Sequence, residues 1–151
     1  PEGDCKLEAQ KEVFRQTIRL AKKIEKTIVV HTRKAEKECL DILEEEQAKN
    51  VVLHCFMGNL RLVKRAQQLG YYLSIPAIIT RLLHFREVVN IMPITQLLTE
   101  TDGPYLAPAK GEISESKDVV NTVKIIAEIK KMTEEEAMKN IFANYQKLFI
   151  T

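Results

Sequence analysis

Hydrophobic residues occur in this chain in two alternating patterns. One is a short continuous run, and the other is a longer stretch with one apolar position every three or four residues. The continuous runs are rich in β-branched residues and predict strands over residues 27–31, 51–56, 71–75 and 94–101. The longer stretches predict amphipathic helices over residues 7–25, 34–49, 58–69 and 117–130, with a last helix that begins at Thr133. We interpret residues 77–90 as a short helix and a loop, and the Pro- and Gly-rich residues 103–115 as a loop.

Two helix boundaries carry specific signals. Gly70 follows the helix predicted over residues 58–69, where a glycine is a common C-cap because it adopts left-handed backbone angles without strain. Thr133 and Glu136 have the spacing of a capping box, in which each residue binds the backbone N–H of the other. Gly70 therefore supports the end of the helix over residues 58–69, and the capping box supports the start of the last helix at Thr133.

Strands and helices alternate along the chain, which predicts an α/β fold of parallel βα units. The strands show no regular alternation of apolar and polar residues, which is typical of a sheet that is covered on both faces. One helix followed by four βα units amounts to half of a TIM (β/α)8 barrel, because a complete barrel has eight units in about 250 residues. We therefore predict one domain over residues 1–151 with half-barrel architecture.

Composition narrows the class of protein only slightly. Hydrophobic residues make up 45% of the 151 residues and charged residues 29%, and 23 basic against 21 acidic residues give a net charge of +2. This balance does not identify a nucleic-acid-binding protein, although a local basic patch remains compatible with it. The sequence has no apolar run of the ~20 residues that a membrane-spanning helix needs. The three cysteines form no C-x-x-C motif, which favours a reduced, cytoplasmic protein.

Metal-binding side chains stand at the ends of three predicted strands. His31 and His54 each close a strand, and Asp102 follows the strand over residues 94–101. Because the carboxyl ends of parallel strands meet at one edge of the sheet, the three residues predict a single metal site there. Imidazole and carboxylate ligands suit Zn²⁺, Mn²⁺ or Ni²⁺, and a carboxylate-rich site also accepts Mg²⁺. The alternative is structural, with buried histidines that cap strands and an aspartate that opens a Gly-Pro turn.

Three further residues are candidates for binding a substrate beside the metal. Glu100 lies two residues before Asp102 and points the same way, so it could orient a ligand, hold a substrate group, or pair with a buried Arg or Lys. Arg33 lies two residues beyond His31, where a guanidinium could hold phosphate oxygens or form a surface ion pair. Gly58 begins the helix after His54, and free backbone N–H groups there could receive an anion.

We interpret Cys55 and the tyrosines as residues that pack within the protein. Adjacent residues of a strand face opposite sides, so if His54 points into the site, Cys55 should pack against the helices. Tyr71, Tyr72 and Tyr105 could stack on nucleobases. With aromatic residues at only 6% of the chain, core or loop packing is the better interpretation of these tyrosines.

Six segments, which run from near the beginning to near the end of the chain, together resemble the TatD family of metal-dependent deoxyribonucleases. The most specific of them is E-T-D-G-P-Y-L, from Glu100 to Leu106. The others are H-T-R-K-A from His31, H-C-F-M-G from His54, G-Y-Y-L-S-I from Gly70, the helix with Gln10, Phe14, Gln16, Leu20 and Ala21, and Asn144 with the closing Leu148 and Phe149.

This resemblance implies a TIM-barrel hydrolase that cleaves phosphodiester bonds in DNA, often single-stranded DNA or 3′ ends, with Mg²⁺ or a transition metal. It implies that His31, His54 and Asp102 bind the metal, and that Asp102 also takes part in catalysis. Arg33, Glu100 and the turn at Gly58 would lie around the substrate phosphate. A non-catalytic α/β module, or a metallohydrolase for another phosphoester or an amide, is the alternative interpretation.

Two motifs of the TatD family are absent from this chain. The family's first strand carries H-x-H and its fourth ends in G-E-x-G-L-D, so the chain resembles the second half of the barrel. After the E-T-D loop the family usually has Asn-Glu-Pro, where this chain has Ser114, Glu115 and Ser116. Three ligands could hold one metal at most. An isolated half barrel also leaves two strand edges and an apolar sheet face open, which predicts a homodimer or an N-terminal half that completes the barrel.

Overall fold

A four-stranded parallel sheet is the centre of the molecule. The computed structural model describes residues 2–150, and the strands follow one another across the sheet in the order β1-β2-β3-β4. Their bounds are β1 (Ile28–His31), β2 (Val51–His54), β3 (Tyr72–Pro76) and β4 (Leu97–Glu100). The helices are α1 (Glu2–Lys23), α2 (Glu36–Glu45), α3 (Leu60–Gln68), α4 (Leu83–Ile91), α5 (Val119–Lys130) and α6 (Glu134–Phe149). This arrangement confirms the predicted parallel βα units.

Some predicted boundaries change. The ambiguous residues 77–90 form a 3₁₀ turn, η1 (Ala77–Thr80), followed by α4. The fourth strand begins at Leu97 instead of Ile94, because a second 3₁₀ turn, η2 (Ile94–Gln96), follows Pro93. Both predicted helix signals are confirmed. Gly70 has a φ of 76°, and Thr133 Oγ1 accepts a hydrogen bond from the N–H of Glu136 at 3.2 Å.

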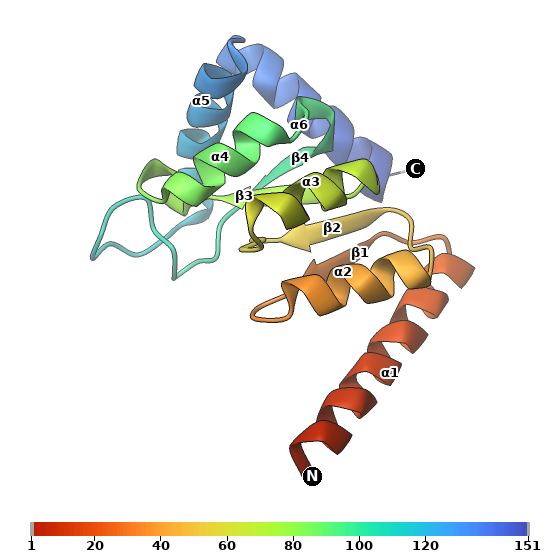
Figure 1. Cartoon of the computed structure of the whole chain (residues 1–151). Coiled ribbons are helices and arrows are strands. Elements are labelled where there is room, and N and C mark those ends of the chain that lie inside the picture. Colours follow the sequence, from red (N-terminus) through yellow and green to blue (C-terminus); the bar gives the residue numbers. More distant parts are fainter. Residues whose placement is uncertain (1, 151) are drawn as a thin grey trace.

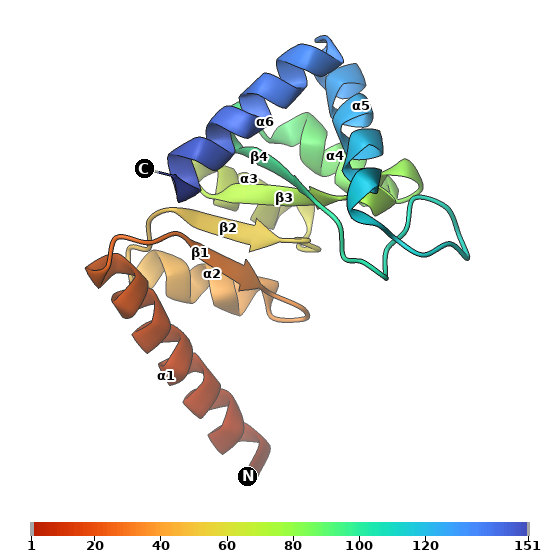
Figure 2. The same ribbon diagram turned by 180° about the vertical axis from the view of Figure 1, so that it is seen from behind.

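The main hydrophobic core lies between the sheet and the helices that cover one of its faces (Figure 1). Side chains from α2, α3 and α4 meet those from the strands there, and Ile18 anchors the second half of α1. The first half of α1 extends away from the rest of the molecule (Figures 1 and 2). The largest fully buried side chains include Leu40, Leu43, Leu53, Phe56, Leu73, Phe85, Met92 and Ile126.

The other face of the sheet is covered only in part. Leu148, near the end of α6, packs there on Val52, Tyr72 and Leu98, and the Thr27 hydroxyl donates to the Leu148 carbonyl. Figure 2 shows α6 crossing this side of the sheet toward the beginning of β1. On β1, Val29 remains 55% exposed. The expectation of a sheet buried on both faces is therefore wrong for β1, which is an edge strand that the last helix does not cover.

Strand register brings the ends of the strands together. His31 pairs with His54, His54 with Ser74, and Pro76 with Glu100 across the three neighbouring strand pairs. In a parallel sheet these positions form one edge. None of the helices in the described part of the chain is long and apolar enough to cross a membrane.

Candidate metal centre

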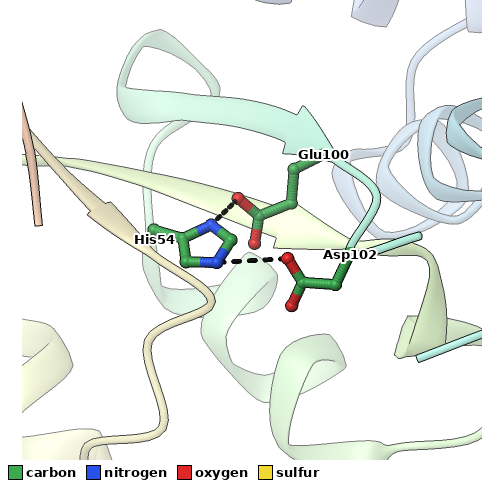
Figure 3. A group of neighbouring side chains, drawn as sticks. All are labelled: His54, Glu100 and Asp102. Atoms are coloured by element: carbon green, nitrogen blue, oxygen red, sulfur yellow. Dashed lines mark hydrogen bonds and ion pairs between the residues drawn. The ribbon is translucent and has the colours of Figure 1, made fainter. Parts of the chain in front are cut away.

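His54 lies between two carboxylates at the carboxyl-terminal edge of the sheet (Figure 3). Its Nδ1 is 2.5 Å from Glu100 Oε2, and its Nε2 is 3.1 Å from Asp102 Oδ1. One ligand atom from each of the three residues lies within 4.8 Å of the others. His54 ends β2, whereas Glu100 ends β4 and Asp102 follows it, so two strands on either side of β3 build the group.

Glu100 is a largely buried carboxylate that the protein only partly neutralises. Ser74 Oγ donates a hydrogen bond to Glu100 Oε2, the oxygen that also faces His54, while the buried Oε1 has no hydrogen-bond partner. Desolvation raises the pKa of Glu100, and Asp102 adds to this, although the Ser74 hydrogen bond and the His54 ring oppose it. A buried carboxylate with an unpartnered oxygen is well suited to a nearby cation.

Ser74 is a residue of this site that sequence reasoning did not find. It lies on β3 between the two strands that carry the group, and its side chain is buried. The G-Y-Y-L-S-I segment contains Ser74, but a serine in an apolar run gives no sign of a role in the site. The register, which sets Ser74 opposite His54, and the hydrogen bond from Ser74 to Glu100 show that it faces the site.

His31 lies beside the group of His54, Glu100 and Asp102 but is not a member of it. Its ring centroid is 5.4 Å from that of His54, with 38° between the ring planes. The structure thus brings His54 and Asp102 together as expected, and it places Glu100 nearer to them than His31. His31 faces the same cavity, so its role as a metal ligand stays a prediction.

Two members of the group, His54 and Asp102, line a cavity of about 710 Å³. Arg33, Lys34 and Glu36 line it beside His31, with two basic side chains and one acidic side chain, and Thr101, Asp102 and Tyr105 line it from the loop after β4. Arg33 thus lines the same cavity as His54 and Asp102, and its role in binding a substrate anion stays a prediction. The cavity is large enough for a small organic ligand.

Gly58 is not among the residues that line this cavity. A Cβ atom at Gly58 would lie 2.5 Å from Cε1 and Cζ of the Phe56 ring, so the absence of a side chain serves close packing. The next residue, Asn59, caps α3, and its Oδ1 accepts hydrogen bonds from the N–H groups of Arg61 and Leu62, each at 3.1 Å. The expectation that free N–H groups there receive an anion is wrong for these two donors, because Asn59 already binds them.

Cys55 packs against the core, as predicted, but it also lines the cavity. The residue has a φ of 45°, in the left-handed region. Alternation of faces applies only within a strand, and β2 ends at His54. Desolvation raises the pKa of the Cys55 thiol to about 12, with further contributions from Glu100 and Asp102. The thiol is therefore protonated at neutral pH and is a poor ligand or nucleophile in that form.

The donor atoms fit a divalent cation. One imidazole nitrogen and two carboxylates suit Zn²⁺, Mn²⁺ or Ni²⁺, and a carboxylate-rich site also suits Mg²⁺. With Nδ1 of His54 against Glu100, its Nε2 is the nitrogen that faces Asp102. A carboxylate that fixes one ring nitrogen while the other binds the ion is the usual support of a metal-binding histidine.

Comparisons with known proteins identify the family of the chain. The family described as TatD related DNase matches residues 2–150. An uncharacterized metal-dependent hydrolase of Bacillus subtilis, YabD, is 37% identical over 146 residues, which cover 93% of this chain and 57% of YabD. Human deoxyribonuclease TATDN3 is 32% identical over 142 residues, which cover 94% of this chain and 52% of the human protein. The chain thus spans about half the length of these curated relatives.

Solved structures show the same fold. The TatD homolog YJJV from Escherichia coli superposes with a TM-score of 0.80 at 24% identity, covering 89% of this chain and 54% of that structure. A TatD family hydrolase from Entamoeba histolytica superposes with a TM-score of 0.78 at 19% identity, covering 91% and 56%. With the family match over nearly its whole length, the chain belongs to the TatD family of DNases.

Proposed function

We propose that this chain carries the metal-binding part of a hydrolase that cleaves phosphodiester bonds in DNA from 3′ ends. The observation that carries the proposal is the group of His54, Glu100 and Asp102, of which His54 and Asp102 line one cavity with Arg33. His54 and Asp102 supply ligands for a cation, Glu100 supports His54, and Arg33 supplies a partner for phosphate. The relative TATDN3, which is named a deoxyribonuclease, supports DNA as the substrate.

In this proposal the residues of the site have distinct roles. Glu100 holds Nδ1 of His54, so that Nε2 of His54, together with Asp102 and His31, binds the metal. When bound, a divalent cation supplies Lewis acidity that polarises the phosphoryl oxygen and activates water. Asp102 also accepts a proton from the attacking water. Arg33 holds phosphate oxygens, for which its planar guanidinium offers two parallel donors.

A nuclease assay tests the function. A single-stranded DNA oligonucleotide labelled at its 5′ end is incubated with the protein and Mg²⁺, Mn²⁺, Zn²⁺ or Ni²⁺. We expect progressive shortening from the 3′ end that EDTA abolishes, because cleavage depends on the bound cation. Cleavage only of small phosphoesters or amides would contradict the DNase assignment. A metal-independent activity would contradict the role of the site.

Exposed apolar surface on α6 and the free edges of the sheet support a second part of the proposal: the chain forms four βα units of a larger barrel. Met138, Phe142, Tyr145 and Phe149 recur at helical spacing on α6 and are exposed. Neighbouring rings of this stripe lie 6.4 Å and 5.2 Å apart. Such a patch usually marks a contact surface. The relatives, about twice as long as the match, point to further βα units as its occupant.

A complementation experiment tests this arrangement. We expect the 151-residue chain to form a 1:1 complex with a separately produced amino-terminal part of YabD, because the added strands would pair with the free edges and cover the apolar stripe. Analytical ultracentrifugation measures the complex, and the nuclease assay measures any gain in activity. A stable homodimer that ignores the added part would favour self-association instead. A well-behaved monomer that binds nothing would contradict both arrangements.

A further inference from the structure

Tyr105 is a large aromatic residue that the structure leaves 74% exposed while it lines the cavity of the metal centre. The other two tyrosines considered for base stacking, Tyr71 and Tyr72, are buried, as the packing interpretation predicts. Tyr105 differs from them, since within residues 6–150 no aromatic ring stacks on it. The side chain thus presents its apolar faces to the cavity and to solvent.

The backbone that carries Tyr105 is anchored in several places. Its N–H donates to the Asp102 carbonyl at 2.7 Å, which places Tyr105 one tight turn after the carboxylate of the metal centre. Further along the loop, Arg81 donates to the Ala107 carbonyl at 3.2 Å, and Thr80 donates to the Pro108 carbonyl at 2.6 Å. A ring on a fixed backbone loses little conformational freedom when it binds a ligand, which favours binding.

Basic side chains and the exposed Tyr105 ring come from different segments that line this one cavity. Arg33 and Lys34 line it beside His31, whereas Tyr105 lines it from the loop after β4, and the half-exposed Met57 adds apolar surface. A nucleotide has the same division, with an anionic phosphate at one end and a flat, weakly polar base at the other. Aromatic side chains bind such bases by stacking on their faces, largely regardless of base identity.

We infer that Tyr105 stacks on the nucleobase attached to the phosphate at the metal centre and so makes the site selective for nucleotides over base-free phosphoesters. This inference rests on the proposed phosphodiesterase function and adds a specificity-determining residue to it. Because stacking does not read hydrogen-bonding edges, Tyr105 gives little preference among the four bases.

Combined changes to Tyr105 and to the substrate test the stacking interaction. Tyr105→Ala and Tyr105→Phe are compared with the parent chain on two oligonucleotides, one intact and one with an abasic 3′-terminal residue. We expect Tyr105→Ala to weaken binding and lower kcat/KM about 5- to 100-fold on the intact oligonucleotide, the range that stacking of one base provides. It should have little effect on the abasic one, and Tyr105→Phe should retain most of the binding. Binding is measured by fluorescence anisotropy in EDTA, and cleavage with the preferred metal.

Ile113→Ala is the matched control, because Ile113 is a large exposed residue of the same loop that does not line the cavity. An equal loss for Tyr105→Ala on both oligonucleotides would overturn the stacking role while leaving the proposed function intact. Failure of the parent chain to cleave DNA with any metal would count against the proposed function. The anisotropy ratio between intact and abasic oligonucleotides would still decide the role of Tyr105 in that case.

Discussion

Replacing Asp102 by Asn is expected to lower the affinity for a divalent metal by more than about 100-fold and to reduce DNA cleavage at least as strongly. Changes to groups that merely support a metal ligand cost about 10- to 100-fold, and Asp102 is a proposed ligand itself. Asn keeps the shape of the side chain but removes the negative charge that lies 3.1 Å from His54 Nε2. Calorimetric titration with Mn²⁺ measures the affinity, and the labelled oligonucleotide measures cleavage.

Asp41→Asn is the control for this variant. Asp41 lies on α2 outside the cavity, where it pairs with Lys37 and Arg65. It carries the same charge, so its replacement should leave metal affinity and cleavage nearly unchanged. Turnover close to that of the parent protein in Asp102→Asn at saturating metal would refute the proposed role of Asp102.

Glu100→Gln is expected to change function and metal-free stability in opposite directions. The variant should cleave DNA about 10- to 100-fold more slowly, because a neutral amide holds His54 less firmly than a carboxylate does. Without metal, the same variant should be more stable than the parent at neutral pH. Burial raises the pKa of Glu100 in the folded protein, so the charged form of this side chain opposes folding.

The direction of the Glu100 pKa shift determines how the stability gained by Glu100→Gln changes with pH. A carboxyl group whose pKa is raised by folding contributes its stability fully below the pKa of the unfolded chain, and that contribution is lost as the pH rises through the folded value. The stability gained by Glu100→Gln should therefore grow with pH and shrink in acid. Urea unfolding in EDTA from about pH 4 to pH 8 measures it. Glu128→Gln, which removes an exposed charge from α5, is the control. Parallel pH profiles for parent and Glu100→Gln would contradict the prediction.

Patterns that depend on neighbouring residues were predicted well. The four strands, the cap at Gly70 and the box of Thr133 and Glu136 follow from local spacing and need no distant partner. The meeting of His54 and Asp102 could also be predicted, because all strands of a parallel sheet end at one edge. These features depend only on chain geometry that repeats from one βα unit to the next.

Details that depend on a single backbone angle or on the register could not be predicted. Cys55 enters the cavity because its left-handed conformation ends the strand's alternation. Gly58 packs on the ring of Phe56, and the contact between a ring and a backbone two residues away has no sequence pattern. Ser74 reaches Glu100 only because of how β3 and β4 align. The spacing of Glu100 and Asp102 predicts that they share one side, but the proximity of Glu100 to His54 depends on the structure.

The order of the strands has a consequence for how the chain acquires its structure during synthesis. In the described sheet each strand pairs with the next one along the chain, so its partner emerges from the ribosome after a single helix. Such contacts between neighbouring segments close short loops and form quickly. The bond from Thr27 to Leu148 spans 121 residues and can form only when translation reaches the last helix. We therefore expect a nascent chain to add β2, β3 and β4 to β1 one unit at a time, and to form the bond between Thr27 and Leu148 only after α6 has been made.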